Sequence, residues 1–273
     1  MSSATNREVG AGEPDWLATT RRLLETEALG CVLEGHAEID STNARALEWA
    51  ADGAPHGATV VADRQTRGRG RLGRTWVGGE GTSLLVSVLV RPVVSDDAWG
   101  LLPLAAGLAV SDALATHVGD AEGPRLKWPN DVLLAGRKVA GILVESVMAR
   151  SRWAVIGVGI NVNQSAMPAE LAASATSLRV ETGEIISRGV LLAAVLQALE
   201  ARLAGLQQDP AGLIRAYAGR LQGIDAPVMV SEVHGGQVEG IAKGVDHTGA
   251  LVVSTAEGER VFRAGEVTLR RAT

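Results

Sequence analysis

An arginine- and glycine-rich segment, residues 65–76 with Arg64 before it, constrains this chain more than any other feature. Five arginines and three glycines share it: Arg64, Arg67, Gly68, Arg69, Gly70, Arg71, Gly73 and Arg74. Guanidinium groups suit carboxylate and phosphate oxygens, and glycine lets the backbone turn tightly against an anion. The segment therefore predicts a loop, here called the arginine loop (residues 65–76), that closes over a small anionic ligand.

The three glycines of the loop also match a dinucleotide-binding pattern, G-x-G-x-x-G. That pattern requires a strand before it and a helix directly after it, because the pyrophosphate sits at the helix N-terminus. Here residues 76–81 form a glycine-rich turn, and the apolar run 82–90 that follows is typical of a strand buried on both faces. The context therefore argues against a Rossmann fold.

Composition narrows the class of protein. An apolar share of 46% indicates a globular chain with a sizeable core, and the net charge of -5 argues against general nucleic-acid binding. The single cysteine, Cys31, excludes an intramolecular disulfide and a cysteine metal cluster. The first 16 residues lack a secretory signal, and no apolar run is expected to span a bilayer. A soluble cytoplasmic protein is expected.

Periodicity and turn residues predict an α+β organisation with three parts. Residues 1–13 read as a disordered tail, residues 14–223 as one α/β body, and residues 224–273 as a small all-β barrel. The predicted helices cover 14–29, 41–51, 95–117, 187–208 and 209–221. The predicted strands cover 58–62, 82–90, 125–128, 132–134, 138–146 and 153–162, then 227–230, 238–245, 251–254, 260–263 and 267–269.

Polar residues at the start of the second helix and next to the arginine loop have two interpretations each. Ser41, Thr42 and Asn43 are typical helix-capping residues, but they also offer donors and acceptors to a neutral polar ligand. Gln65 is either a surface side chain or a carboxamide that binds an amide or ureido group through both of its polar atoms.

Three later segments also leave alternatives open. Residues 127–131, Lys-Trp-Pro-Asn-Asp, form either a plain hairpin turn or a turn with an added charge and an aromatic wall. Lys138 is either a charge at a strand edge or a site residue. Glycines inside the strands 138–146 and 153–162 indicate either tight packing or a ligand lying across the sheet.

Several catalytic patterns are missing from the sequence. It contains no Walker A sequence, no H-E-x-x-H and no G-x-S-x-G, and its five histidines lack metal-ligand spacing. Nothing therefore points to a covalent enzyme intermediate.

The five motifs together resemble those of biotin–protein ligases. They are residues 41–43, 65–76, 127–131, 138–143 and 157–161. Their order and spacing carry the resemblance, which covers the chain from about Ile39 to the C-terminus. It implies a catalytic body like that of class II aminoacyl-tRNA synthetases, followed by an SH3-like C-terminal barrel.

The resemblance also implies two half-reactions, as in a biotin–[acetyl-CoA-carboxylase] ligase. The biotin carboxylate attacks the α-phosphate of ATP, with Mg²⁺ as activator, and gives biotinyl-5′-AMP and pyrophosphate. A lysine of a biotin carboxyl carrier protein domain then attacks the mixed anhydride. Catalysis of this kind needs positioning and cationic stabilisation, and no side-chain nucleophile. ATP, Mg²⁺ and biotin are the small molecules implied, without a tightly bound cofactor.

Roles carry over by position in the motifs. The biotin-binding residues implied are Ser41, Thr42, Asn43, Gln65, Arg69, Gly70, Arg71 and Lys138. The nucleotide-binding residues implied are Gly68, Trp76, Asn130 and Asn161, and the catalytic residues implied are Lys138, Arg71 and Asp131. Lys138 would bridge the biotin carboxylate and the phosphate, while the resemblance leaves the metal ligands undefined.

Some relatives carry an N-terminal helix-turn-helix and repress transcription. Only about 40 residues precede Ser41, fewer than such a domain needs, so DNA binding is not expected. Two alternatives stay open: a lipoate–protein ligase, and a nucleic-acid-binding module that uses the arginine loop and the terminal barrel. The polar residues 41–43 favour biotin, and one Tyr with one Phe leave little for base stacking.

Overall fold

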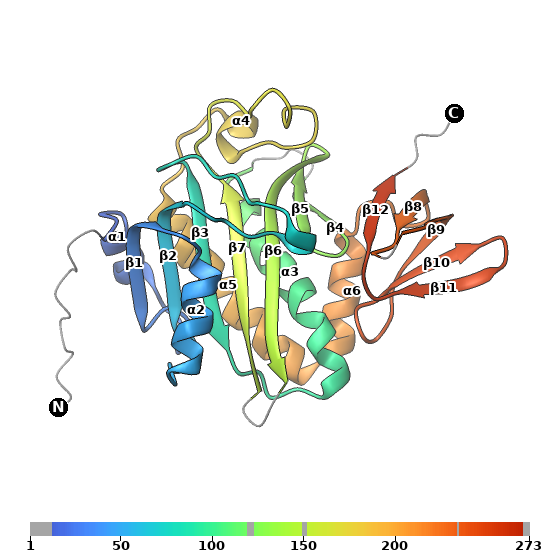
Figure 1. Ribbon diagram of the computed structural model, residues 1–273, viewed down its shortest axis with the longest axis horizontal. Coiled ribbons are helices and arrows are strands. Elements are labelled where there is room, and N and C mark those ends of the chain that lie inside the picture. The colour runs from blue at the N-terminus through green and yellow to red at the C-terminus, as the bar shows by residue number, and fades with distance from the viewer. Residues whose placement is uncertain (1–12, 119–122, 149–151, 234, 270–273) are drawn as a thin grey trace.

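A seven-stranded mixed sheet and a five-stranded antiparallel sheet form the framework of the protein (Figure 1). The structure is a computed structural model that describes residues 13–118, 123–148, 152–233 and 235–269. The predicted tail, apart from Glu13, lies outside the described residues. The predicted change of texture after residue 223 is confirmed, because β8, the first strand of the second sheet, begins at Pro227.

The larger sheet has the strand order β1-β2-β3-β7-β6-β5-β4. Its strands are β1 (Leu33–Ile39), β2 (Thr59–Gln65), β3 (Ser83–Val90), β4 (Arg125–Lys127), β5 (Asp131–Leu134), β6 (Arg137–Met148) and β7 (Arg152–Asn161). β1 and β2 run parallel, and the other neighbours run antiparallel. Every residue of β3 is buried, as its two apolar faces predict.

Helices cover both faces of this sheet (Figure 1). They are α1 (Leu17–Leu23), α2 (Thr42–Ala51), η2 (Asp96–Leu101), α3 (Leu102–Ala115), α4 (Leu178–Thr182), α5 (Arg188–Gln208) and α6 (Pro210–Arg220). On one face α2 packs Ala46 and Ala50 near Val60 and Leu89. On the other face α3, α5 and α6 enclose the main core.

Two helical segments correct the expectation that no apolar run is long enough for a membrane. Asp96–Ala115 and Arg188–Gln208 both reach the required length and hydropathy. Most of the first and half of the second are buried within the protein, and both contribute to the main core. Core helices of water-soluble proteins can be equally long and apolar, so length and hydropathy alone are weak evidence that these two segments cross a membrane.

Two predicted helices need correction, and two elements were missed. The first helix ends at Leu23 and not at Leu29, because the Glu200 carboxylate of α5 accepts the backbone N–H groups of residues 27–29 and holds them in a turn. The helix expected from residue 95 begins as the 3₁₀ segment η2, and Ser95 makes no side-chain cap. The strand β1 and the short helix α4 were not predicted at all.

The C-terminal sheet has the order β11-β10-β9-β8-β12. Its strands are β8 (Pro227–Ser231), β9 (Gln237–Val245), β10 (Leu251–Thr255), β11 (Gly258–Phe262) and β12 (Glu266–Leu269). The turn between β9 and β10 docks on the body, where the buried Trp128 donates its Nε1–H to the Gly249 carbonyl at 3.0 Å. Trp128 therefore connects the two sheets. The sequence suggested only an aromatic wall at residues 127–131.

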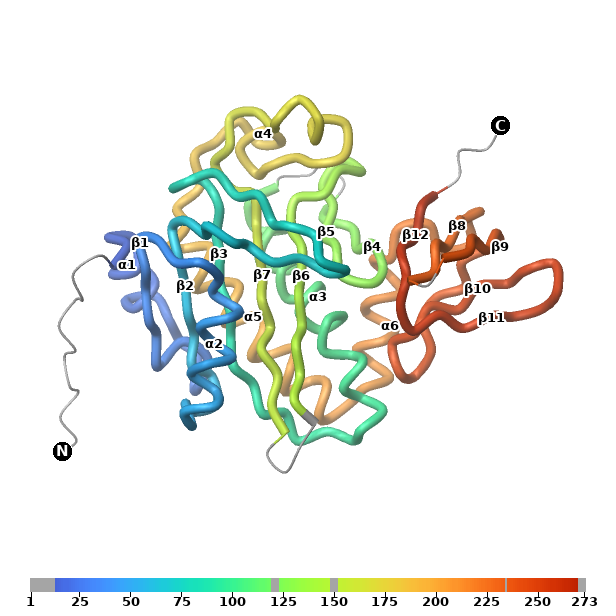
Figure 2. The backbone as a smooth tube through the Cα atoms, in the orientation of Figure 1, coloured from blue at the N-terminus to red at the C-terminus, as the bar shows by residue number. Residues whose placement is uncertain are grey.

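The connection from β2 to β3 crosses in front of β7 and β6, on the face that carries α2 (Figure 2). The arginine loop forms the first part of this crossing. A short hairpin holds it, in which Gly70 N–H donates to the Arg74 carbonyl at 2.7 Å and Trp76 N–H to the Gly68 carbonyl at 3.1 Å. No helix follows the loop glycines, which confirms the argument against a Rossmann fold.

Candidate functional site

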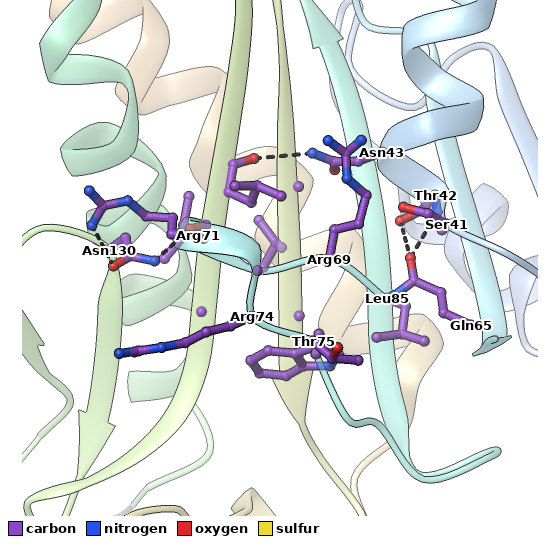
Figure 3. Close-up of a pocket in the computed structure, with 18 of the residues that line it drawn as sticks. Ser41, Thr42, Asn43, Gln65, Arg69, Arg71, Arg74, Thr75, Leu85 and Asn130 are labelled. Atoms are coloured by element: carbon purple, nitrogen blue, oxygen red, sulfur yellow. Dashed lines mark hydrogen bonds between the residues drawn. The ribbon is translucent and has the colours of Figure 1, made fainter. Parts of the chain in front are cut away.

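A cavity of about 820 Å³, including its open mouth, lies between the sheet and the arginine loop (Figure 3). It gathers residues from the start of α2, the end of β2, the loop, β5, β6 and β7. Most of the predicted site residues line it: Ser41, Thr42, Asn43, Gln65, Arg69, Gly70, Arg71, Trp76, Asn130, Asp131 and Lys138. Residues far apart in the sequence, from Ser41 to Glu266, thus line one cavity.

At one end of the cavity, Thr42 and Gln65 are fixed to each other (Figure 3). The Gln65 Oε1 accepts the Thr42 backbone N–H at 2.8 Å and the Thr42 hydroxyl at 3.0 Å. The Gln65 oxygen is therefore occupied, and its NH₂ group is the part left to bind a ligand, in place of the two-point contact that the sequence suggested. Ser41 caps α2 by accepting the Ala44 N–H at 3.4 Å, so its hydroxyl proton stays available.

A buried serine that the sequence analysis missed holds the next residue of the motif. Ser87 of β3 donates its hydroxyl to Asn43 Oδ1 at 2.6 Å and lies 2.8 Å from Thr42 Oγ1. Asn43 Nδ2 in turn donates to Glu145 Oε2 at 2.9 Å and faces the Leu143 carbonyl at 3.4 Å. The Asn43 amide is thus fully engaged by the protein.

The strand glycines accommodate side chains of the site. A Cβ at Gly157 would overlap Asn43 Oδ1, and a Cβ at Gly159 would lie 2.5 Å from Cε2 of the Trp76 ring. Gly141, opposite Gly159 in the sheet, would place a Cβ 3.0 Å from the same ring. Of the two interpretations, these contacts are tight packing, and the packed groups are the side chains of Asn43 and Trp76.

The other end of the cavity carries two oppositely charged side chains, Lys138 and Asp131. The Lys138 Nζ forms an ion pair with Asp131 Oδ1 at 2.6 Å and lies 5.7 Å from the centre of the Trp76 ring. Lys138 is about one-third exposed, so its ammonium group faces the cavity while the carboxylate holds it. Lys138 and Asp131 belong to neighbouring strands, β6 and β5, whose pairing brings the motifs 127–131 and 138–143 together.

No carboxylate in the described part of the chain contacts Arg71. Its guanidinium donates to Asn130 Oδ1 at 3.4 Å, and the Asn130 amide donates to the Ile142 carbonyl at 2.8 Å. Burial lowers the pKa of Arg71, while the more distant carboxylates of Asp131 and Glu266 raise it. An arginine stays protonated despite such a shift, so Arg71 presents an incompletely neutralised cation to the cavity.

The C-terminal sheet also reaches the site. Glu266, at the start of β12, lines the cavity and forms an ion pair with Arg74 of the loop. The hydrogen bond from Arg74 lowers the pKa of the Glu266 carboxyl. Neither residue was predicted as a site residue, because the sequence gives no sign that a strand of the second sheet meets the arginine loop.

A second, larger cavity adjoins the first and shares Arg74, Trp76, Asp131 and Lys138 with it. Its walls are mainly apolar, with Met167 and Leu171 after β7 and Val267 from β12. Asn161 lines this second cavity, and its amide donates to the Thr176 carbonyl at 2.9 Å.

Gly68 is buried and lines neither of these two cavities. A Cβ there would lie 2.5 Å from the Trp76 carbonyl oxygen, so its role in the structure is to let the hairpin of the loop close. Among the described residues, no group of three His, Cys, Asp or Glu side chains is arranged to hold a metal ion.

Comparisons with known proteins agree on one family. Residues 36–163 match the biotin/lipoate A/B protein ligase family, and residues 227–270 match the biotin protein ligase C-terminal domain. The chain is 40% identical over 235 residues to a biotin–[acetyl-CoA-carboxylase] ligase of Mycobacterium tuberculosis, covering 85% of this chain and 86% of that protein. It is 36% identical to the enzyme of the same name from Paracoccus denitrificans, covering 85% of this chain and 98% of the relative.

Solved structures give the same result. The biotin protein ligase of Aquifex aeolicus, determined in complex with biotin and ATP, is similar with a TM-score of 0.76 and 33% identity. The similarity covers 90% of this chain and 100% of that one, so it includes both sheets.

Proposed function

Because this chain belongs to the biotin/lipoate A/B protein ligase family, we propose that it is an ATP-dependent biotin–protein ligase. It activates biotin as biotinyl-5′-AMP and transfers it to a lysine of an acceptor protein. The observation that carries the proposal is the first cavity, in which a polar pocket, a lysine and an arginine loop surround one space. The ureido head of biotin suits the polar pocket, and its carboxylate suits the lysine and the arginine loop.

The biotin head group is placed at the Thr42 end of the cavity. The Ser41 hydroxyl and the Gln65 NH₂ group supply donors to the ureido oxygen, and the Thr42 and Gly70 backbones flank it. Asn43 supports this end through its contacts with Ser87 and Glu145. This polar lining favours biotin over lipoate, whose dithiolane ring offers no comparable hydrogen-bonding groups.

Charge separates the two chemical steps along the cavity. Lys138 and Arg71 stand where the biotin carboxylate meets the α-phosphate of ATP, and they stabilise the charge that develops on the phosphoryl oxygens. The carboxylate oxygen attacks phosphorus and pyrophosphate leaves. The acceptor lysine, as the free amine, then attacks the acyl carbon, forms the amide bond and expels AMP.

The second cavity suits the nucleotide. The Trp76 ring and the apolar side chains of Met167 and Leu171 offer a surface for adenine, and Asn161 fixes the chain beside it. Asp131 lies where the two cavities meet, and its neighbour Asn130 lines the first. Mg²⁺ is commonly held by one or two carboxylates together with substrate phosphates. Asp131 is the carboxylate of the described residues that suits this role, with ATP completing the shell.

The remaining inferences concern context. The names of the relatives point to a biotin carboxyl carrier domain of a carboxylase as the acceptor protein. Because the proposed reaction consumes ATP, we assign the protein to the cytoplasm. We assign residues 14–223 to a class II synthetase-like catalytic domain and residues 224–273 to an SH3-like domain. The loop arginines support the enzyme over a nucleic-acid-binding module, because Arg64, Arg69 and Arg74 pair with carboxylates of the protein itself.

Biotin-dependent release of pyrophosphate from ATP tests the proposal. We expect release with biotin and Mg²⁺, and little release when lipoate replaces biotin. Release with lipoate alone would favour the lipoate ligase. A filter-binding measurement with DNA and RNA addresses the other alternative, since tight binding without biotin-dependent release would favour a nucleic-acid-binding module.

A matched pair of glycine substitutions tests the placement of biotin. Gly157→Ala is expected to raise the KM for biotin about tenfold or more, because its methyl group displaces Asn43 from the head-group end. Gly205→Ala is the control, since a Cβ there, on helix α5, meets nothing within 4 Å. Equal KM values for the two variants would contradict the placement.

A further inference from the structure

Glu145 stands outside the cavity but contacts two residues that line it. It lies on β6, two residues after Leu143, and was not among the predicted site residues. Its side chain is about one-quarter exposed, and both of its carboxylate oxygens are in use. Oε1 lies 2.6 Å from the Arg69 guanidinium of the arginine loop, and Oε2 accepts Asn43 Nδ2 at 2.9 Å.

The Asn43 contact has a defined direction. Ser87 gives its proton to Asn43 Oδ1, so the Asn43 NH₂ group must face Glu145 and the Leu143 carbonyl. An amide turned the other way would set its oxygen against two acceptors. The carboxylate of Glu145 therefore fixes the amide in one orientation, at the point where α2 begins.

The Arg69 contact concerns the loop. The loop's own hairpin bonds hold its shape, but they do not attach it to the sheet beneath. Arg69 has no other carboxylate partner among the described residues, and its side chain rises beside Asn43 (Figure 3). The Glu145 carboxylate thus attaches the middle of the loop to β6 and, through Asn43, to α2.

We propose that Glu145 is a positioning residue that holds the arginine loop over the head group of biotin. The proposal rests on the proposed function, because it assigns the space below Arg69 to biotin. Glu145 touches neither substrate. One oxygen of its carboxylate holds the Arg69 guanidinium and partly neutralises that positive charge of the loop. The other oxygen holds the Asn43 amide at the start of α2. Loss of the charge frees the middle of the loop, while the contacts of Arg71 with Asn130 and of Arg74 with Glu266 remain and the donors of the pocket stay in place.

Kinetics of Glu145→Gln test the proposal. The new amide still accepts the Asn43 N–H through its oxygen, but its NH₂ group then faces the Arg69 guanidinium and the ion pair is lost. We expect the KM for biotin to rise about fivefold, the size of effect given by a partly exposed charged pair. The kcat for pyrophosphate release should stay within about twofold, because Lys138 and Arg71 are untouched.

Glu38→Gln is the matched control. Glu38 of β1 makes an ion pair with Arg64 at the base of the same loop, both side chains are about half exposed, and neither lines the cavity. The same chemical change there should leave the KM for biotin unaltered. Thermal unfolding of each variant shows whether the fold is retained.

A second substitution shows whether the two side chains act together. Arg69→Gln, at a side chain that is about half exposed, should raise the KM to the same extent. The double variant should then be no worse than either single one. A Glu145→Gln KM equal to that of Glu38→Gln, an unchanged KM in Arg69→Gln, or additive effects would each overturn the proposal. A wild-type protein without biotin-dependent pyrophosphate release would instead contradict the proposed function itself.

Discussion

Replacing Lys138 by alanine is expected to lower the rate of biotin adenylation by about 100- to 1,000-fold while biotin affinity falls only a few-fold. Lys138 lines both cavities, which the proposed function assigns to biotin and to the nucleotide, so its ammonium group is proposed to lie where the carboxylate and the phosphate meet. The polar contacts at the Thr42 end lie elsewhere and survive the change. Pyrophosphate release and the equilibrium binding of biotin, measured side by side, separate the two effects.

The ion pair with Asp131 sharpens this prediction. Without Lys138, the Asp131 carboxylate stands unneutralised beside two incoming anions. Asp131 is also the carboxylate proposed for Mg²⁺, so adding Asp131→Asn to Lys138→Ala should deepen the loss of rate and not relieve it. Lys243→Ala is the control, because Lys243 lies on β9 of the C-terminal sheet, where it pairs with Asp225, and it lines neither cavity. Adenylation near the wild-type rate in Lys138→Ala would show that Lys138 is a strand-edge charge.

The sequence predicted most of the fold where local pattern and tertiary structure agree. Helix α2 after its Ser41 cap, helix α5 after its Ser187 cap, and the continuously apolar strand β3 were placed within a few residues. Strand β1 was missed because its residues 34–38 include two glutamates, a histidine and a glycine, and it is held at the edge of the sheet by pairing with β2. Helix α1 was drawn too long because Glu200, far along the chain, sets where it ends.

The site was predicted where a motif carried it. Ser41, Gln65, Lys138 and the arginine loop meet in one cavity, as the resemblance implied. Ser87 and Glu145 were missed because a serine in an apolar strand and a glutamate near a strand end read as ordinary residues. Glu266 needs the docking of the second sheet, which no local pattern encodes. Gly68 is part of the same motif, but it lines neither cavity and instead allows the hairpin of the loop to close.

The loop also has to retain the product of the first half-reaction. A mixed anhydride that escapes acylates any amine it meets, so the enzyme must hold it until the acceptor docks. Arg71 supplies an incompletely neutralised cation to the cavity, steadied by Asn130. Its fork is suited to the phosphate oxygens of the adenylate. Of the loop arginines, it is the one that burial most clearly favours for contact with the intermediate.

Arg71→Gly is therefore expected to leave biotinyl-5′-AMP formation measurable but to release the intermediate. The change removes the cation and adds backbone freedom to the loop. We expect streptavidin blots to show biotin on a bystander protein such as albumin, incubated with enzyme, biotin and ATP, at a level the wild type does not reach. Free hydroxylamine, added in excess, should abolish this labelling because it captures the escaped anhydride.

Arg67→Gly separates the two causes of release. Arg67 lies in the same loop with its side chain 82% exposed, and its nearest carboxylate contact, Asp40, is 3.9 Å away. The same substitution there adds backbone freedom without removing a cation from the cavity. If Arg67→Gly labels albumin as strongly as Arg71→Gly, loop flexibility alone explains the release. If neither labels it despite normal pyrophosphate release, retention depends on other groups, and the role assigned to the Arg71 guanidinium is wrong.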